Sequence, residues 1–362
     1  MTTATIRDVA AQARVSIKTV SRVINNVTTV KPHTRERVMR VIRKLDYHPN
    51  PSARGLSGSR SYVISLLYDR SCDYYATSVL AGVLETCRAA HYQVIMQPCD
   101  HRSPALADEV ARNAKQSRAA GVILTPPLSD QLALLGVLKQ QQIPYVRIAP
   151  AEHSDNQRTV YTNDRESSAR MTEHLAALGH TRIGFIIGNP HHAAVADRHK
   201  GYLDGLKNCG LTVDKTLIAQ GYNSHASGMQ CARKLLQVPD DQRPTALFAS
   251  NDEMAAGVLA VAHSMGLGVP DDLSVAGFDD MPLASQVWPA LTTIRQPISA
   301  MSAKAADLLL QQLRGEPEDR AAHVLESSLT FHQSTGPAKN LKLQQVRSNR
   351  RAKAAVTSAG SE

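Results

Sequence analysis

Short apolar runs alternate with amphipathic segments from about residue 61 to residue 336. The apolar runs predict strands at 63–68, 93–97, 121–124, 145–148, 182–187, 246–249 and 274–278. The segments between them predict helices that include 79–90, 107–118, 165–178, 200–208 and 253–265. Such alternation is typical of parallel α/β domains. Because this region is too long for one ordinary core, we expect two lobes, with ligands collecting between them at the carboxyl ends of the strands.

The first fifty residues have a different pattern, with three short amphipathic helices. Thr5 and Asp8 are spaced as a capping box for the first helix, and Ser16 can cap a second helix at 17–24. A third helix is predicted at 32–45, with its apolar side chains on one face. Two short helices joined by a tight turn and braced by a third form a helix-turn-helix, whose second helix fits the major groove of DNA. A small three-helix bundle with a solvated basic face is the alternative.

The distribution of charge favours DNA binding at this end of the chain. Residues 1–60 hold twelve Lys and Arg against three acidic residues, and the resulting +9 equals the formal net charge of the whole chain. This basic head is followed by a body whose formal net charge is zero. The distribution indicates that a polyanionic partner binds at the N-terminal end of the chain. On the second helix, Lys18 can donate to guanine and Ile17 can pack on a thymine methyl group. The remaining candidates are Thr19, Ser21, Arg22 and Asn25, which suit phosphates, together with Thr5, Ser16 and Thr34.

A set of short motifs extends along almost the whole chain. In the head these are Thr5-Ile6-Arg7-Asp8-Val9-Ala10, Val15-Ser16, Thr19-Val20-Ser21-Arg22-Val23-Ile24-Asn25 and Leu45-x-Tyr47-x-Pro49-Asn50. In the body they include Leu178-Gly179-His180-x-Arg182-Ile183-Gly184, Ser250-Asn251-Asp252, Val275-x-Gly277-Phe278-Asp279-Asp280 and Leu291-Thr292-Thr293-Ile294-x-Gln296-Pro297. With these motifs the sequence resembles the LacI/GalR family of bacterial transcription regulators.

The resemblance implies a division of the chain into a head, a hinge and a sensor. We expect a helix-turn-helix domain at 1–49 and a hinge helix at 50–60, with Asn50, Ala53 and Leu56 as DNA contacts. In the family this helix forms only on DNA, and a leucine wedges into the minor groove. A periplasmic-binding-protein-like sensor is expected at 61–337, with lobe 1 at about 61–161 and 294–322 and lobe 2 at about 162–290 and 323–337. The basic stretch 338–362 is expected to be a disordered tail.

The resemblance also implies which residues contact a small effector. Arg198 and Asp279 match family positions that commonly grip polar groups of the ligand, although the two could instead pair with each other across the closed lobes. An Asp and an Arg beside an aromatic wall suit a sugar. The complete set of candidate effector contacts is Asp69, Tyr74, Tyr75, Arg147, Arg198, Asn251, Asp279 and Trp288. The two tyrosines and Trp288 could serve packing instead, and Arg147 stands where relatives often carry an acidic residue.

Other classes of protein and site are disfavoured by the sequence. His191, His192 and His199 have no usual metal-ligand spacing, so we expect no metal site and no cofactor. Five cysteines without a Cys-x-x-Cys pair indicate reduced thiols in a cytosol. No apolar stretch reaches transmembrane length, and no signal sequence precedes the first helix. The chain lacks a Gly-x-Gly-x-x-Gly or Walker motif and a coherent nucleophile–base pair, which argues against an enzyme.

The sequence therefore predicts a cytoplasmic homodimer that represses transcription from a palindromic operator in double-stranded DNA, with no membrane partner. A sugar or glycoside is expected to modulate its binding. The alternatives are a repressor that depends on a purine or nucleoside corepressor and, in another class, a sugar-binding transport protein.

Overall fold

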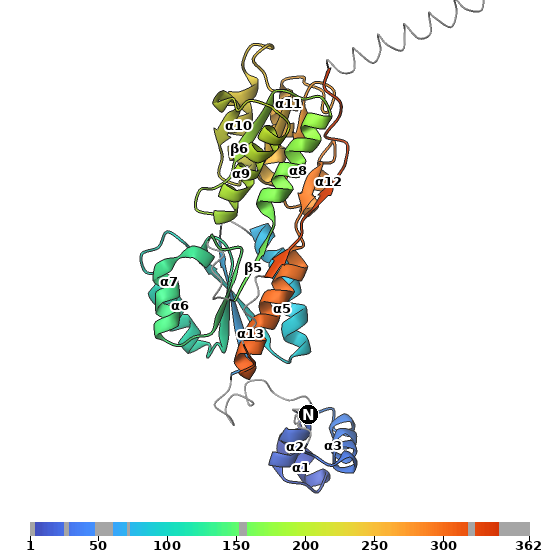
Figure 1. Cartoon of the computed structure of the whole chain (residues 1–362). Coiled ribbons are helices and arrows are strands. Elements are labelled where there is room, and N and C mark those ends of the chain that lie inside the picture. The colour runs from blue at the N-terminus through green and yellow to red at the C-terminus, as the bar shows by residue number, and fades with distance from the viewer. Residues whose placement is uncertain are drawn as a thin grey trace, which may run out of the picture. The chain divides into compact units, whose positions relative to one another are not determined.

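The computed structural model describes residues 4–24, 29–47, 61–70, 73–151, 158–317 and 323–339. The chain forms two compact units, Met1–Tyr62 and Val63–Glu362, and the elements of both are labelled in Figure 1. The predicted residues Asn25, Asn50, Ala53 and Leu56 lie outside the described part, as does the side chain of Tyr74. None of the helices in the described residues combines the length and apolar character that a membrane crossing requires.

The first unit is a helix-turn-helix built from α1 (Ile6–Gln12), α2 (Ile17–Ile24) and α3 (Pro32–Lys44). The predicted capping box is present, because the Thr5 backbone N–H donates to Asp8 Oδ2 at 2.8 Å and Asp8 N–H donates to Thr5 Oγ1 at 3.4 Å. Ser16 Oγ accepts from the backbone N–H of Thr19 at 3.1 Å and so starts α2 as predicted. Small apolar side chains from all three helices form the core: Val9, Ala10, Ala13, Val20, Val23, Val38 and Val41.

The first lobe of the second unit is a six-stranded parallel sheet in the order β11-β5-β4-β3-β1-β2. Its strands are β1 (Val63–Asp69), β2 (Gln93–Cys99), β3 (Gly121–Leu124), β4 (Tyr145–Ile148), β5 (Thr159–Thr162) and β11 (His323–Leu325). Alternate strand residues point to opposite faces. Ile64, Ile123 and Val146 therefore pack under α5 (Asp73–Ala89) and α13 (Ile298–Arg314). The other face packs under α6 (Leu106–Gln116), η1 (Leu128–Asp130) and α7 (Leu132–Gln140), and both layers are visible in Figure 1.

The second lobe repeats this plan with a four-stranded parallel sheet in the order β7-β6-β8-β9. The strands are β6 (Ile183–Ile187), β7 (Ile218–Gln220), β8 (Ala246–Ala249) and β9 (Ser274–Ala276), and η2 (Lys215–Leu217) leads into β7. One face carries α8 (Asp164–Ala177) and α9 (Ala193–Asn208), and the other carries α10 (His225–Leu236) and α11 (Asp252–Ser264). The short helix α12 (Pro282–Gln286) follows β9. Helices α8 and α9 approach closely, since a Cβ at Gly201 would lie 2.1 Å from the Arg165 carbonyl oxygen.

The chain passes between the lobes more than once. It leaves the first sheet after β5 and returns through β10 (Thr293–Arg295), which pairs antiparallel with β12 (Ser328–Thr330). The predicted lobe boundary at residue 323 is wrong, because β11 at 323–325 pairs with β5 and belongs to the first sheet.

The predicted start of the tail at residue 338 is also wrong. Ala338 is buried, and its N–H donates to the Leu178 carbonyl oxygen at 2.8 Å. The next side chain, Lys339, pairs with Asp272 at 2.7 Å. Both residues are therefore attached to the second lobe, and the rest of the predicted tail lies outside the described residues.

Candidate functional site

A cavity of about 90 Å³ lies between the two lobes of the second unit. Several of the residues that line it lie just after strands of the two sheets, and others belong to the helices that follow. Its walls are formed by Tyr75, Pro126, Ala149, His192, Ala194, Val195, Arg198, Asn223, Asn251, Glu253, Asp279, Met281 and Gln296. Pro126 and Ala149 follow β3 and β4 of the first sheet, and Asn223 and Asn251 follow β7 and β8 of the second. The cavity therefore occupies the carboxyl ends of the strands, where open α/β sheets bind ligands.

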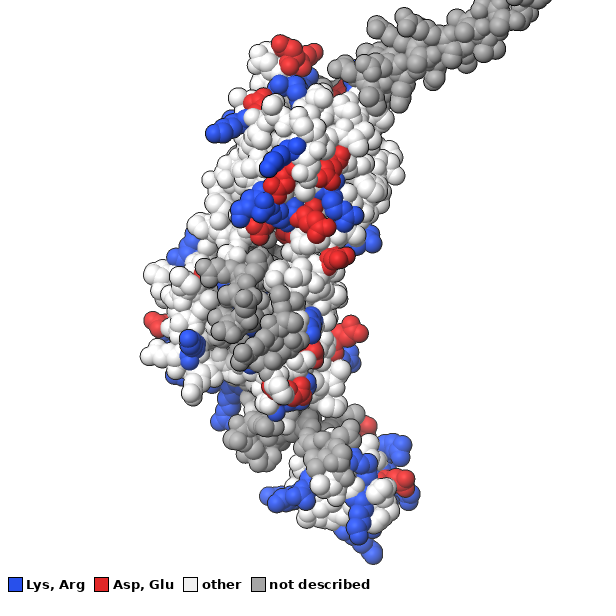
Figure 2. All heavy atoms as spheres, in the orientation of Figure 1, with Lys and Arg blue, Asp and Glu red and all other residues white. Residues whose placement is uncertain are grey.

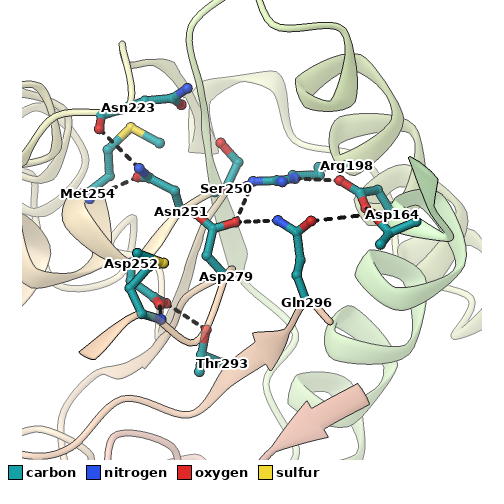
Figure 3. Close-up of polar contacts among 12 residues, drawn as sticks. Asp164, Arg198, Asn223, Ser250, Asn251, Asp252, Met254, Asp279, Thr293 and Gln296 are labelled. Atoms are coloured by element: carbon teal, nitrogen blue, oxygen red, sulfur yellow. Dashed lines mark hydrogen bonds and ion pairs between the residues drawn. The ribbon is translucent and has the colours of Figure 1, made fainter. Parts of the chain in front are cut away.

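Arg198 on α9 is the centre of a buried charge network (Figure 3). Its Nε donates to Asp164 Oδ2 at 2.8 Å, its Nη1 donates to the Ser250 carbonyl oxygen at 2.6 Å, and Nη1 lies 3.3 Å from Asp279 Oδ1. The guanidinium carbon also sits 3.7 Å from the centre of the Phe278 ring, a cation–π geometry. Although burial alone would lower the pKa of Arg198, the two carboxylates raise it. The predicted partners thus pair within the second lobe and not across the cleft.

Asp279 is held by its backbone and by two partners. Its φ of 107° is unusual for a residue other than glycine, and its N–H donates to the Ile294 carbonyl oxygen at 2.8 Å. Gln296 Nε2 donates to Asp279 Oδ1 at 2.6 Å. Burial raises the pKa of Asp279 to about 6, although Arg198 and Gln296 act in the opposite direction. Because this pKa exceeds the ordinary value, the carboxyl contributes stability at low pH that is lost as the pH rises through about 6.

Gln296 also connects the segments that cross between the lobes. While its amide nitrogen donates to Asp279, its Oε1 accepts from Thr162 Oγ1 at 3.3 Å. Thr162 ends β5 and also donates to Asp164 at the start of α8. The side chain of Gln296 is 7% exposed, so these hydrogen bonds are shielded from water. One polar chain therefore runs from the cavity through two crossing segments (Figure 3).

Asn251, which follows β8, forms another part of the cavity wall. Asn251 caps α11 by accepting from the Met254 N–H at 3.0 Å, and its Nδ2 donates to the Asn223 carbonyl oxygen at 3.0 Å. Behind it, Asp252 accepts from Thr293 Oγ1 at 2.6 Å. Burial, together with the nearby Asp279 charge, raises the pKa of Asp252 well above its usual value. The cavity is therefore bounded by groups whose positions are fixed by the surrounding hydrogen bonds.

The first unit presents a basic surface, on which Figure 2 shows Lys and Arg side chains gathered. Its described residues hold ten Lys and Arg against three acidic side chains. On α2, Ile17 is 45% exposed, Lys18 and Arg22 are exposed, and Thr19 and Ser21 are half-buried. Ser16 and Thr5 are exposed at helix starts, and Thr34 is half-buried in α3. The predicted contact residues on α2 are thus outside the apolar core, where DNA can reach them.

The family description "Bacterial regulatory proteins, lacI family" matches residues 5–50, and "Periplasmic binding protein-like domain" matches residues 172–335. The HTH-type transcriptional regulator DegA of Bacillus subtilis (strain 168) is 33% identical over 335 residues, which cover 92% of this chain and 98% of DegA. The chain belongs to the LacI family.

Other LacI-family proteins match over similar lengths. The HTH-type transcriptional repressor CytR of Escherichia coli (strain K12) is 31% identical over 92% of this chain and 97% of CytR. The solved complex of the transcriptional regulator CelR with cellobiose has 29% identity and a TM-score of 0.70, covering 91% of this chain and 99% of CelR. The lac repressor dimer bound to operator and the anti-inducer ONPF has 27% identity and a TM-score of 0.74, covering 92% of this chain and 100% of the lac repressor chain. The present LacI-family chain is a DNA-binding transcription regulator, and these relatives are regulators and not enzymes.

Four of the predicted effector residues of this LacI-family chain meet in the cavity: Tyr75, Arg198, Asn251 and Asp279. Asp69, Arg147 and Trp288 are not among the described residues that line it. Asp69 instead accepts from the His101 N–H at 3.0 Å and lies 2.7 Å from His101 Nδ1.

Arg147 and Trp288 are placed by other contacts. The Arg147 guanidinium donates to the Ser129 carbonyl oxygen at 2.7 Å and to Asp130 at 2.9 Å. It holds the turn after β3, while Ala149, two residues further along, lines the cavity. Trp288 is 87% exposed.

Sequence reasoning missed several residues of the cavity. Gln296 lies inside a motif that carried the family resemblance, and this motif was the available signal for it. Glu253 follows the Ser250-Asn251-Asp252 motif directly, and His192 precedes α9. Asn223 follows a strand of only three residues, β7, which leaves no clear apolar run in the sequence.

Proposed function

We propose that this LacI-family regulator is a cytoplasmic repressor that binds a palindromic operator as a homodimer, and that a small sugar or glycoside sets its affinity for the operator. The observation that carries this proposal is the cavity at the strand ends of both lobes. Its fixed donors and acceptors, Arg198, Asn251, Asp279 and Gln296, suit a ligand with several hydroxyl groups. The bound cellobiose of CelR, a relative with the same fold, supports the same ligand class.

The cavity also supports a mechanism of regulation. A ligand held between the lobes contacts Gln296 and Asp279, which belong to the polar chain joining the crossing segments. Binding therefore acts on the angle between the lobes. A ligand shifts the DNA-binding equilibrium only if its affinity differs between the competent and incompetent states.

A binding assay with full-length protein tests the DNA part. Sites are selected from a random duplex pool, and fluorescence anisotropy then compares the selected site with a scrambled one across a salt series. We expect Lys18→Ala to relax base preference at one position of each half-site, at a cost of about 1–3 kcal/mol in discrimination. Arg37→Ala, which removes an exposed cation from α3, is the matched control and should leave base preference unchanged. Leu56→Ala should weaken binding to the selected site far more than to the scrambled one.

A thermal-shift screen of sugars tests the effector part. We expect one sugar to stabilise the protein and to change operator affinity at the same concentrations. Equal affinity for selected and scrambled DNA would refute the DNA-binding role. A nucleobase that stabilises the protein and promotes operator binding, while sugars have no effect, would replace the sugar with a purine-type corepressor.

A further inference from the structure

The charges around the cavity do not balance. Among the described residues that line it, Arg198 is a cation, whereas Asp279 and Glu253 are carboxylic acids. Asp164 lies directly behind, 2.8 Å from the Arg198 Nε. The single guanidinium therefore faces three acidic groups.

Arg198 already donates to protein groups through its Nε and Nη1. Its two carboxylate partners, the Ser250 carbonyl oxygen and the face of the Phe278 ring surround the guanidinium. An arginine that recognises a phosphate or a carboxylate normally offers a bidentate face to that anion. Here the two internal carboxylates already compensate the charge, so an anionic ligand would have to compete with both.

The other basic group in the wall does not supply the missing positive charge. His192 lines the cavity, and burial, together with the nearby Arg198 charge, lowers its pKa to about 4. Its imidazole is therefore neutral at pH 7 and can exchange hydrogen bonds without attracting an anion.

Glu253 adds negative charge at the same wall. It is half-buried at the second position of α11, next to Asp252, and it accepts a hydrogen bond from the backbone N–H of His225 at the start of α10. Negative charge near the positive end of a helix is favourable. Burial and the nearby Asp279 raise the pKa of Glu253. Glu253 lines the cavity, so a ligand bound there would lie next to its carboxyl group.

We propose that the cavity selects uncharged or amine-bearing sugars and rejects sugars that carry a carboxylate or phosphate, and that Glu253 is the residue that enforces this choice. The inference rests on the proposed sugar effector and narrows it to a charge class. A carboxylate within several ångströms of a ligand anion repels it through a partly desolvated medium, which is sufficient for a tenfold or greater effect. The same carboxylate attracts a protonated amine.

Matched ligands separate charge from shape. Isothermal titration calorimetry on the full-length protein at pH 7 uses glucose, glucosamine, glucuronate and glucuronamide, and the corresponding galactose and mannose series. Glucuronate and glucuronamide have nearly the same shape and differ in charge. In the series that binds, we expect the uronamide or the amino sugar to bind at least about tenfold more tightly than the uronate.

Glu253→Gln tests the assigned residue, since the amide keeps the size and can still accept from the His225 N–H. We expect this variant to reduce the uronamide-to-uronate ratio about tenfold or more and to weaken binding of the amino sugar. Glu85→Gln removes the same charge from an exposed position of α5 and should leave both ratios unchanged. If Glu253→Gln does not fold, the wild-type series alone still decides the charge class.

The outcomes distinguish this inference from the proposed function. The charge selection is refuted if a uronate binds the wild-type protein as tightly as its uronamide, or if Glu253→Gln leaves the uronamide-to-uronate affinity ratio unchanged. Either result is still consistent with a sugar effector. If no sugar of any charge binds and a nucleobase does, the sugar effector fails and the charge selection fails with it.

Discussion

Replacing Arg198 with Met removes the only cation that the network at the cavity places between Asp164 and Asp279. The two ion pairs span 2.8 Å and 3.3 Å, and the Arg198 side chain is only 10% exposed. Breaking a buried pair by removing one partner typically costs about 3–5 kcal/mol, because the remaining charge stays buried without compensation. We therefore expect Arg198→Met to lower the free energy of unfolding of the second unit by about 3–5 kcal/mol.

Urea unfolding of the full-length protein at pH 7, followed by far-ultraviolet circular dichroism, measures this effect. Arg165→Met is the matched control, since Arg165 forms a 2.6 Å pair with Asp204 but is 58% exposed. Exposed ion pairs contribute about 1 kcal/mol or less, so this control should change the free energy of unfolding very little.

A triple variant separates charge from lost packing. When Asp164→Asn and Asp279→Asn are added to Arg198→Met, no uncompensated carboxylate remains, and the new amides can still accept the existing hydrogen bonds. We expect the triple variant to recover at least half of the lost stability. If it is as unstable as the single variant, or if Arg198→Met costs no more than Arg165→Met, the electrostatic explanation of this network is refuted.

Three further predictions concern other parts of the chain. Acidification from pH 7 to pH 5 should stabilise the wild type by about 1 kcal/mol relative to Asp279→Asn in paired urea titrations, because protonation of a carboxyl with a pKa of about 6 favours the folded state; equal pH dependence would contradict the raised pKa. Gly201→Ala should cost about 2 kcal/mol or more, because its Cβ would lie 2.1 Å from a carbonyl oxygen of α8, whereas Gly136→Ala on α7 meets nothing within 4 Å and should raise the melting temperature. Thr5→Ala should destabilise α1 by about 1 kcal/mol through loss of the capping box, seen as faster amide exchange at 6–13 with no change in the second unit.

The sequence predicted the buried strands well and the polar or short strands poorly. The predicted strands 121–124, 145–148 and 246–249 match β3, β4 and β8, because parallel strands covered on both faces appear as continuous apolar runs. Strand β5 has the sequence Thr-Val-Tyr-Thr, and β7 has only three residues, so neither produces such a run. Helix α10, which begins with a capping box formed by Ser224 and Ser227, was not predicted.

Cavity residues were predicted where they matched family motifs, and the predictions failed where a long-range partner decides the direction of a side chain. Arg198 and Asp279 were predicted, although the sequence left open whether they contact the ligand or each other. Arg147 points to Asp130 across 17 residues of sequence, and Asp69 pairs with His101 across 32, and neither contact follows from local spacing. Ala149, the first residue after β4, lines the cavity, whereas the side chain of Arg147 within the strand is held by Ser129 and Asp130.

The Gln296 amide makes two hydrogen bonds that connect the cavity to the joint between the lobes. Its nitrogen binds a cavity carboxylate, and its oxygen binds the threonine that ends β5, so the wall of the proposed effector cavity and the joint between the lobes share a single side chain. Under the proposed function, an effector that takes either hydrogen bond would loosen or tighten that joint when it binds. No relay through intermediate residues would then be needed for this first step. A substitution of Gln296 would uncouple effector binding from the change of angle between the lobes, while most of the cavity wall would stay in place.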